Sequence, residues 1–403
     1  MTTIQLKPHK EESLLRFHPW VFSGAIRTIR LDRDYPYDAP QEGELVQVVD
    51  SHDHILGVGH YQIGSIAVRI LAFGTGELPR DFWRERIKAA YQMRQAVGLI
   101  TPANNTYRLV HGEGDFLPGL VVDIYADTAV VQAHSVGMHL HRQEIAQAIV
   151  DEVVNVRNVY YKSDDTLPFK ARIDGERVGY LIGGDTPDMR DGFWAMENGL
   201  SFRIDWLRGQ KTGFFIDQRE NRALLERYAR GKDVLNMFCY TGGFSVYALR
   251  GGARLVHSVD VSEKAIDLVR CNVARNFPEG APHEAFAQEA FAYMADIQDK
   301  YDLIILDPPA FAKHRDAIPN ALRGYRRLNA KAFECIRSGG LLFTFSCSQA
   351  VDKEMFRLAV FSAAAQVGRR VRILHQLHQP QDHPINIYHP EGEYLKGLVL
   401  QVE

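Results

Sequence analysis

Hydrophobic and polar positions alternate in the first part of the chain, from Glu42 to Leu71. Apolar side chains recur at every second position in much of the runs 44–49 and 66–71, and the residues between these runs include three glycines. A period of two is typical of strands with one buried face, so this region predicts a small β-rich domain. From Asp81 to Val97 the apolar positions follow helical spacing, which predicts a helix after that domain.

The middle of the chain, residues 107–180, mixes both patterns. The apolar runs 119–125 and 128–133 predict a pair of strands, and a helix near 139–152 and a strand at 158–161 are expected to follow. These elements indicate an α+β unit. The glycine-rich stretch 112–119 lacks the Gly-Lys-Ser/Thr of a phosphate-binding loop, so we expect a Pro-Gly turn between strands there.

Strands and helices alternate in the remainder of the chain. Runs rich in Val, Ile and Leu predict strands at 233–238, 255–259, 301–306 and 340–345, and helices are expected at 243–250, 263–275 and 317–336. This order predicts an α/β fold with a doubly wound, mostly parallel sheet, which binds ligands at the carboxyl ends of its strands. The expected domains are residues 1–78, 79–190 and 191–403.

Composition fits a globular protein of several domains. The 403 residues are 46% hydrophobic and 24% charged. The N-terminus shows no signal segment and no stretch is apolar enough to span a membrane, so a cytoplasmic location is expected. The four cysteines have no paired metal spacing, and we expect free thiols and no metal. The sequence does not indicate whether the chain forms a homodimer.

The net charge of −3 gives no general attraction to nucleic acid, so any RNA-binding surface must be local. Residues 203–232 hold eight basic and four acidic side chains, and residues 313–337 hold seven and two. From charge alone, a solvated helix face is the favoured interpretation of either segment. The second segment directly follows Asp307, where it could hold phosphates or lower the pKa of a nearby thiol.

A glycine turn after the first strand of the last domain points to a nucleoside cofactor. The strand leads into Phe238, Tyr240, Thr241, Gly242 and Gly243, and Asp260 ends the next strand 18 residues after Gly242. An acid at about this spacing meets a ribose hydroxyl. The G-x-G-x-x-G spacing that binds a pyrophosphate is absent, which favours S-adenosylmethionine. Glu289 is expected to face the adenine, although a plain turn with an incidental Asp would give a similar pattern.

Candidate catalytic residues follow two further strands at the same edge of the predicted sheet. Asp307 is followed by Pro308 and Pro309, which hold the chain extended beside the methyl donor. Cys347 follows the next strand. A thiolate that adds to carbon 6 of a pyrimidine makes carbon 5 nucleophilic, and a carboxyl group such as that of Asp307 could stabilise the adduct through ring nitrogen 3. The sequence does not identify the base that later removes the carbon 5 proton.

A lone cysteine at a strand end is more often a buried packing residue, and we expect that role for Cys239, Cys271 and Cys335. The position of Cys347 beside Asp307 and the glycine turn favours a nucleophile there.

Six stretches in order resemble the ribosomal RNA large-subunit methyltransferase I family, which forms 5-methylcytosine in 23S rRNA. The resemblance extends over nearly the whole chain. The stretches are residues 18–24, 210–219, 240–244, 307–311, 344–348 and 388–397.

This resemblance implies an N-terminal PUA-type RNA-binding domain, a small central domain and a Rossmann-like methyltransferase domain whose last two strands form an antiparallel hairpin. It also implies that residues 210–219 approach the cofactor and the target base. The cofactor contacts expected there are Gln210, Thr212 and Gly213. The expected contacts to the RNA base are Asp217, Gln218, Arg219, Pro308, Pro309 and Phe311.

Three alternatives remain at this point. A 23S rRNA guanine exocyclic-amine methyltransferase would share the glycine turn and the Asp307–Phe311 loop but would need no thiol. A non-catalytic RNA-binding ribosome-assembly factor would not bind S-adenosylmethionine. A nicotinamide dehydrogenase is disfavoured by the missing G-x-G-x-x-G.

Overall fold

The computed structural model of the chain describes residues 1–168, 173–184, 193–312 and 314–403, and these form two units. The first unit comprises Met1–Gly192, Asp205–Gly213 and Gln381–Gly392. The second comprises Phe193–Ile204, Phe214–Pro380 and Glu393–Glu403. Two short segments of the predicted third domain, residues 191–403, therefore belong to the first unit. The predicted division into three domains stays a prediction.

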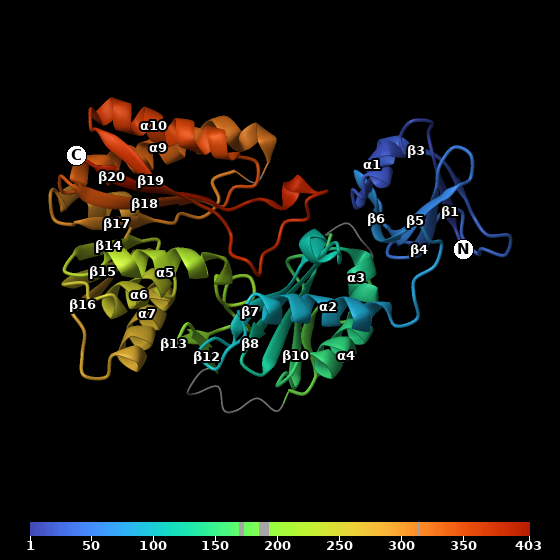
Figure 1. Cartoon of the computed structure of the whole chain (residues 1–403), viewed down its shortest axis with the longest axis horizontal. Helices are drawn as coiled ribbons and strands as arrows, with labels where there is room; N and C mark the ends of the chain where they lie inside the picture. The colour runs from blue at the N-terminus through green and yellow to red at the C-terminus, as the bar shows by residue number, and fades with distance from the viewer. Residues whose placement is uncertain (169–172, 185–192, 313) are drawn as a thin grey trace. The chain divides into compact units, whose positions relative to one another are not determined.

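The first unit begins with a six-stranded sheet of order β2-β6-β5-β4-β1-β3 (Figure 1). Its strands are β1 Thr3–Leu6, β2 Trp20–Phe22, β3 Ile26–Arg30, β4 Leu45–Val49, β5 Ile55–Tyr61 and β6 Ile66–Phe73, with helix α1 Glu12–Leu15 after the first strand. Apolar side chains from alternate positions, such as Val46 and Val48, form its core. The predicted β-rich domain is confirmed.

A second sheet in this unit has five strands in the order β11-β10-β9-β8-β7. Its strands are β7 Thr106–His111, β8 Leu120–Tyr125, β9 Thr128–Ala133, β10 Asn158–Lys162 and β11 Val178–Ile182, and its helices are α2 Phe82–Ala96, α3 Val136–Leu140 and α4 Arg142–Glu152. The predicted strand pair is present as β8 and β9, which are antiparallel. The single helix predicted at 139–152 is instead two helices that meet at His141.

The turn predicted before β8 is present, because the Leu120 N–H donates to the Leu117 carbonyl (3.0 Å) and Gly119 has φ +85°.

The second unit is built on a seven-stranded sheet of order β16-β15-β14-β17-β18-β20-β19. Its strands are β14 Asp233–Met237, β15 Leu255–Asp260, β16 His283–Ala287, β17 Leu303–Leu306, β18 Gly340–Ser346, β19 Val371–Leu377 and β20 Lys396–Val402. The first five strands are parallel, and β20 runs antiparallel to both β18 and β19. The expected doubly wound sheet and the antiparallel hairpin are both confirmed. A separate hairpin, β12 Phe193–Glu197 with β13 Leu200–Ile204, precedes this sheet.

Helices cover both faces of this sheet. Helices α9 Ile318–Cys335 and α10 Lys353–Val367 lie on one face, and α5 Arg219–Tyr228, α6 Gly243–Arg250 and α7 Glu263–Asn276 lie on the other (Figure 1). Local chemistry sets several ends: Ser262 Oγ accepts the Ala265 N–H at the start of α7, and α10 ends at Gly368, whose φ is +75°. The short helix α8 Ala290–Tyr293 follows β16.

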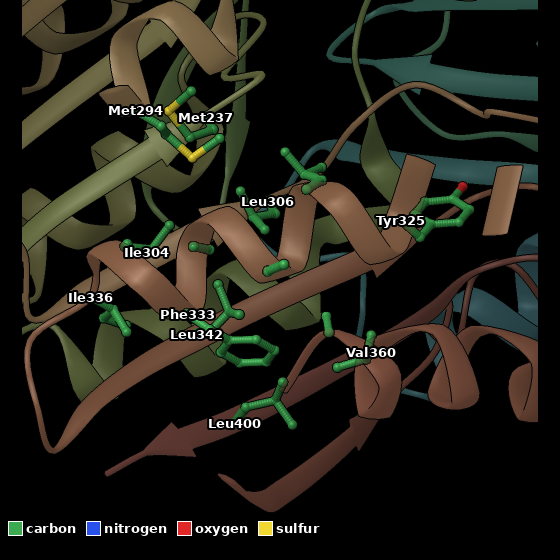
Figure 2. Close-up of a cluster of buried hydrophobic side chains, with 14 of the residues drawn as sticks. Met237, Met294, Ile304, Leu306, Tyr325, Phe333, Ile336, Leu342, Val360 and Leu400 are labelled. Carbon is green, nitrogen blue, oxygen red and sulfur yellow. The ribbon is translucent and has the colours of Figure 1, made fainter. Parts of the chain in front are cut away.

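The core of the second unit lies between the sheet and α9. Figure 2 shows Leu342 beside Phe333 of α9, with Leu306 in the same cluster, and all three are completely buried. Tyr325 belongs to the same cluster, although it carries a hydroxyl group. Burial of this much apolar surface stabilises the sheet and holds α9 in place beneath the strand ends.

Candidate functional site

Four of the predicted motifs follow neighbouring parallel strands. The glycine turn follows β14, Asp260 ends β15, Asp307 follows β17 and Cys347 follows β18. In the registered pairs, Met237 lies opposite Leu306, and Leu306 lies opposite Thr344. The carboxyl ends of these strands therefore meet at one edge of the sheet, where doubly wound folds bind their ligands.

The glycine turn has an unusual backbone. Phe238, Tyr240 and Gly242 have φ values of +56°, +46° and +79°, and α6 begins directly after Gly242. Left-handed backbone at side-chain-bearing residues costs free energy and concentrates at functional sites. Hydrogen bonds hold the turn, because the Cys239 N–H donates to the Val259 carbonyl (3.1 Å) and Gly242 N–H donates to the Cys239 carbonyl (2.7 Å).

Asp260 is bound to this turn. Its carboxylate accepts the N–H groups of Tyr240 and Ser262, each at 3.0 Å. The side chain is half-buried, and each carboxylate oxygen can accept a further hydrogen bond. A half-buried acid with acceptor capacity beside a close-approach glycine turn fits the ribose of a nucleoside such as S-adenosylmethionine.

Glu289 has a local role. It is exposed and caps α8, because its Oε2 accepts the Ala292 N–H (2.9 Å). Its expected contact with adenine stays a prediction.

The loop after β17 is attached to its neighbours on both sides. Asp307 is half-buried, Pro308 is buried and Pro309 is exposed. The ring of Phe311 packs at a tilt against that of Tyr325 with centroids 4.6 Å apart, and the Ala312 N–H donates to Ser348 Oγ (3.2 Å). The loop that carries Asp307 is thus tied to the loop that carries Cys347.

The loop around Cys347 is fixed by a hydroxyl network. Ser346 Oγ donates to the Tyr325 hydroxyl (2.9 Å), and that hydroxyl also lies 2.8 Å from Ser348 Oγ. Burial raises the pKa of Tyr325, so its hydroxyl stays protonated. Both serines are fully buried, whereas Cys347 between them is half-buried. The network therefore immobilises the backbone on both sides of a thiol that solvent can reach.

All four cysteines are free thiols, as predicted. Cys239 and Cys335 are buried, and burial raises the pKa of both thiols. Cys271 is half-buried on α7, where Arg203 Nη1 approaches its sulfur at 3.8 Å.

Lys396 is a charged residue at this edge that the sequence analysis did not identify. It begins β20 and is only 5% exposed. Its Nζ donates to the carbonyls of Ser348 (2.6 Å) and Tyr394 (2.7 Å). The signal was present within the stretch 388–397, but only the antiparallel register of β20 on β18 brings this lysine beside the cysteine loop.

The stretch 210–219 is divided between the two units, and the cofactor contacts expected of Gln210, Thr212 and Gly213 fall in the first. Thr212 Oγ1 there donates to Asp123 Oδ2 (2.6 Å) and lies 3.0 Å from the Tyr125 hydroxyl. Gly213 has φ +114°, and Gln210 is exposed. The cofactor contacts of these residues stay predictions.

Asp217, Gln218 and Arg219 belong to the second unit and are buried. Asp217 Oδ2 accepts the Tyr394 hydroxyl (2.7 Å), and Gln218 Oε1 accepts the Asn221 amide (2.7 Å). Asp217 is therefore linked through Tyr394 to the start of β20. Contacts of these three residues with the RNA base stay predictions.

An ion pair that sequence reasoning missed holds this segment. Arg222 donates to both carboxylate oxygens of Glu197 (2.9 and 2.7 Å) and to the Phe215 carbonyl (3.0 Å), and it is buried. Tyr247 donates to the same carboxylate (2.9 Å). A buried bidentate pair of this kind fixes geometry, since removal of one partner leaves an uncompensated charge.

The two basic stretches differ. In residues 203–232, Arg219 and Arg222 are buried, so this stretch does not present one cationic face. In residues 313–337, the exposed arginines Arg323, Arg326 and Arg327 lie three and four residues apart on α9, which places them on one face of the helix. Lys313 lies outside the described residues.

One group of side chains in the described residues has the composition of a metal site, namely His18, His389 and Glu391. The backbone N–H of Trp20 donates to His18 Nδ1 (3.2 Å), which puts the ring proton of His18 on Nε2. That Nε2 is the atom nearest Glu391 (3.7 Å), and a protonated nitrogen has no lone pair for a metal. This hydrogen-bonding pattern disfavours a metal at the group.

Comparison with known families gives two matches. Residues 176–388 match a family described as S-adenosylmethionine-dependent methyltransferases, and residues 4–73 match the PUA-like domain. None of the helices in the described part of the chain combines the length and hydropathy needed to cross a bilayer.

Curated relatives are similar along their whole length. Proteins named ribosomal RNA large subunit methyltransferase I from Tolumonas auensis, Shewanella frigidimarina and Aeromonas hydrophila are each 38% identical, with 99% of both chains covered. Among solved structures, a SAM-dependent methyltransferase from Streptococcus mutans is 24% identical, has a TM-score of 0.81 and is covered completely, as is this chain. A methyltransferase structure with the same scores was solved in complex with SAH. These structures support the fold.

Proposed function

Because the chain belongs to the ribosomal RNA large subunit methyltransferase I family and carries its S-adenosylmethionine-dependent domain, we propose that it forms 5-methylcytosine in 23S rRNA through a covalent adduct on Cys347. The observation that carries this proposal is the setting of Cys347. It is a half-buried thiol on an immobilised loop, beside the loop of Asp307 and at the edge that carries the glycine turn.

The chemistry needs a nucleophile because carbon 5 of cytosine is a weak one by itself. The sulfur electron pair of Cys347 forms a bond to carbon 6, and carbon 5 becomes an enamine carbon. S-adenosylmethionine, when bound, would supply the electrophilic methyl group to carbon 5, with cleavage of its sulfur–methyl bond and release of S-adenosylhomocysteine. A base then removes the carbon 5 proton, the sulfur–carbon 6 bond breaks, and the thiolate is restored.

Asp307 is suited to stabilise the adduct. Asp307 follows β17, and Cys347 follows the neighbouring strand β18. Pro308 and Pro309 prevent the chain after Asp307 from continuing as a helix. A protonated carboxyl group there donates a hydrogen bond to ring nitrogen 3, where negative charge develops when the sulfur adds.

We propose that the residues of the predicted cofactor site hold S-adenosylmethionine, with Asp260 on the ribose and the glycine turn close to the methionine portion. The full set is Phe238, Tyr240, Thr241, Gly242, Gly243, Asp260, Glu289, Asp307, Gln210, Thr212 and Gly213. The proposed contacts to the target base are Pro308, Pro309, Phe311, Asp217, Gln218 and Arg219.

A trapping experiment tests the mechanism. The full-length chain is incubated with S-adenosylmethionine and 23S rRNA transcribed with 5-fluorocytidine. Fluorine at carbon 5 cannot leave as a proton does, so the adduct persists and should appear as a protein–RNA band that survives denaturing gel electrophoresis. The Cys347→Ala variant should give no band and no methylation of ordinary 23S rRNA.

Cys271→Ala is the matched control, because Cys271 is also a half-buried free thiol. It should form the adduct like the unmodified chain. Full methylation by Cys347→Ala, or methylated guanine as the product in nucleoside mass spectrometry, would contradict the proposal and favour an exocyclic-amine methyltransferase.

A further inference from the structure

The start of β20 brings a buried cation to the cysteine loop. Lys396 lies directly opposite Ser346 in the antiparallel register of β18 and β20, one residue before Cys347. Its Nζ donates to the Ser348 carbonyl, one residue after Cys347. Lys396 is therefore held against the cysteine loop on both sides of Cys347, by its strand register at Ser346 and by its ammonium group at Ser348.

The ammonium group has few ways to balance its charge. Its two assigned hydrogen bonds go to neutral carbonyl groups, those of Ser348 and Tyr394. Burying a charged amine is unfavourable unless a negative charge lies close by. Burial accordingly lowers the pKa of Lys396 to about 8, and the charge of the Cys347 thiolate is the strongest influence that raises this pKa.

Other charged groups act on the same lysine more weakly. Glu393 and Asp352 favour its ammonium form, and Lys353 opposes it. Lys353 and Glu393 also form an ion pair with each other, which reduces the effect of either one on Lys396. The Tyr325 hydroxyl, which contacts the same loop through Ser346 and Ser348, is protonated and carries no charge.

We propose that Lys396 is a positioning residue whose ammonium group holds Cys347 as the thiolate and keeps the loop at residues 346–348 in place. This inference rests on the proposed function of Cys347. The thiol proton passes to the amine or to water, which leaves a thiolate beside an ammonium ion. An opposite charge a few ångströms from a thiol lowers its pKa, and the thiolate is the reactive nucleophile.

This assignment differs from the role that the sequence suggested for the basic stretch 313–337. Arg323, Arg326 and Arg327 in that stretch are exposed, so water screens their charge. Lys396 is almost fully buried, and a charge in that environment acts more strongly on a neighbouring thiol.

The test measures the acidity of Cys347 directly. The full-length chain is alkylated with iodoacetamide at a series of pH values from 5 to 9.5, and the rate at the Cys347 peptide is followed by mass spectrometry. Replacement of the ammonium in Lys396→Met should raise the pH midpoint of alkylation by about one unit, which slows the reaction roughly tenfold near pH 7. Lys396→Arg keeps the positive charge and should keep the low midpoint.

Lys353→Met serves as the control, because it removes an exposed lysine from the same neighbourhood and should leave the midpoint where it is. Since Lys396→Met removes a buried group, its fold is checked by thermal unfolding. If this variant does not fold, the unmodified chain is tested instead. The pH midpoint for alkylation of Cys347 must then be lower in the folded chain than in the same chain unfolded in urea.

An unchanged midpoint in folded Lys396→Met, or equal midpoints in folded and urea-unfolded chains, would overturn the inference. The readout does not involve methylation or RNA. A shifted midpoint combined with a failed fluorocytidine trap would therefore retain the assignment of Lys396 and reject only the proposed function.

Discussion

At the scale of single residues, Gly242 provides a test of the proposed cofactor site. Its φ of +79° is left-handed, and a Cβ at this position would come within 2.9 Å of Val269 Cγ1. Gly242→Ala should cost about 1–2 kcal/mol through the backbone alone. Because the strain falls in the turn that we assign to the cofactor, we expect roughly tenfold weaker binding of S-adenosylmethionine, measured by titration calorimetry.

Gly231→Ala is the matched control for this prediction. Gly231 has φ +70° and open space around its Cβ position, so alanine introduces the same backbone cost in the same unit. Both variants should unfold at lower urea concentration, but only Gly242→Ala should lose affinity for the cofactor. Equal affinity in the two variants would remove the glycine turn from the cofactor site.

Single residues also show which parts of the candidate site could be predicted from the sequence. Asp307 and Cys347 were found because each directly follows an apolar strand, which is a local signal. Lys396 and Tyr325 were missed because their roles depend on tertiary pairing. Nothing near Lys396 in the sequence shows that it will face Ser346, and nothing around Tyr325 shows that its hydroxyl will bind two serines far along the chain.

At the scale of elements, we predict that the exposed arginines of α9 contact RNA phosphates. Its buried side packs on the sheet through residues such as Phe333, and its exposed side carries Arg323, Arg326 and Arg327. Each lost phosphate contact reduces the salt dependence of RNA affinity by roughly 0.7–0.9 in the log–log slope. The double variant Arg323→Ala/Arg326→Ala should therefore bind an rRNA fragment more weakly and with a shallower slope.

The control for α9 is Arg270→Ala/Arg372→Ala, which removes two positive charges from exposed side chains elsewhere. Filter binding at several salt concentrations gives both slopes. If the two double variants have the same slope, the effect belongs to net charge, and the α9 surface is not an RNA contact.

The elements that the sequence predicted well are those with long, regular patterns. Strands β14, β15, β17 and β18 are almost entirely buried and carry apolar residues at half or more of their positions, which is typical of the centre of a parallel sheet. The sequence pattern gave no residue range for β16, because this strand lies at the edge and its positions are only half-buried or exposed. Strand β19 is the other edge strand, and its half-exposed pattern gave an equally weak signal.

At the scale of the whole molecule, neither of the two units is a single continuous stretch of the sequence. Residues Asp205–Gly213 and Gln381–Gly392 belong to the first unit, although both segments are flanked by parts of the second. Arg94 illustrates the cause: it is buried and donates to the carbonyl of Asp382, almost 300 residues later (2.8 Å). Domain boundaries drawn from local composition cannot detect a partnership across that separation.

Acid should destabilise the whole molecule through histidines whose removal from water lowers their pKa. Burial lowers the pKa of His60 to about 3 in the first unit and of His283 to about 4 in the second, from an ordinary value of 6.5. Between these limits the unfolded chain binds protons that the folded chain does not. The free energy of unfolding therefore falls as the pH drops below about 6.5, by up to ~1.4 kcal/mol per pH unit for each ring.

His60→Leu isolates one of these contributions. The ring nitrogens of His60 have no hydrogen-bond partner among the described residues, so leucine removes the titrating group without breaking a hydrogen bond. Urea unfolding at pH 7.5 and pH 5 should show that the unmodified chain loses about 2 kcal/mol more than the variant over this interval. Parallel losses in the two proteins would mean that His60 is protonated in the folded state, and its burial would then have to be compensated by a negative partner.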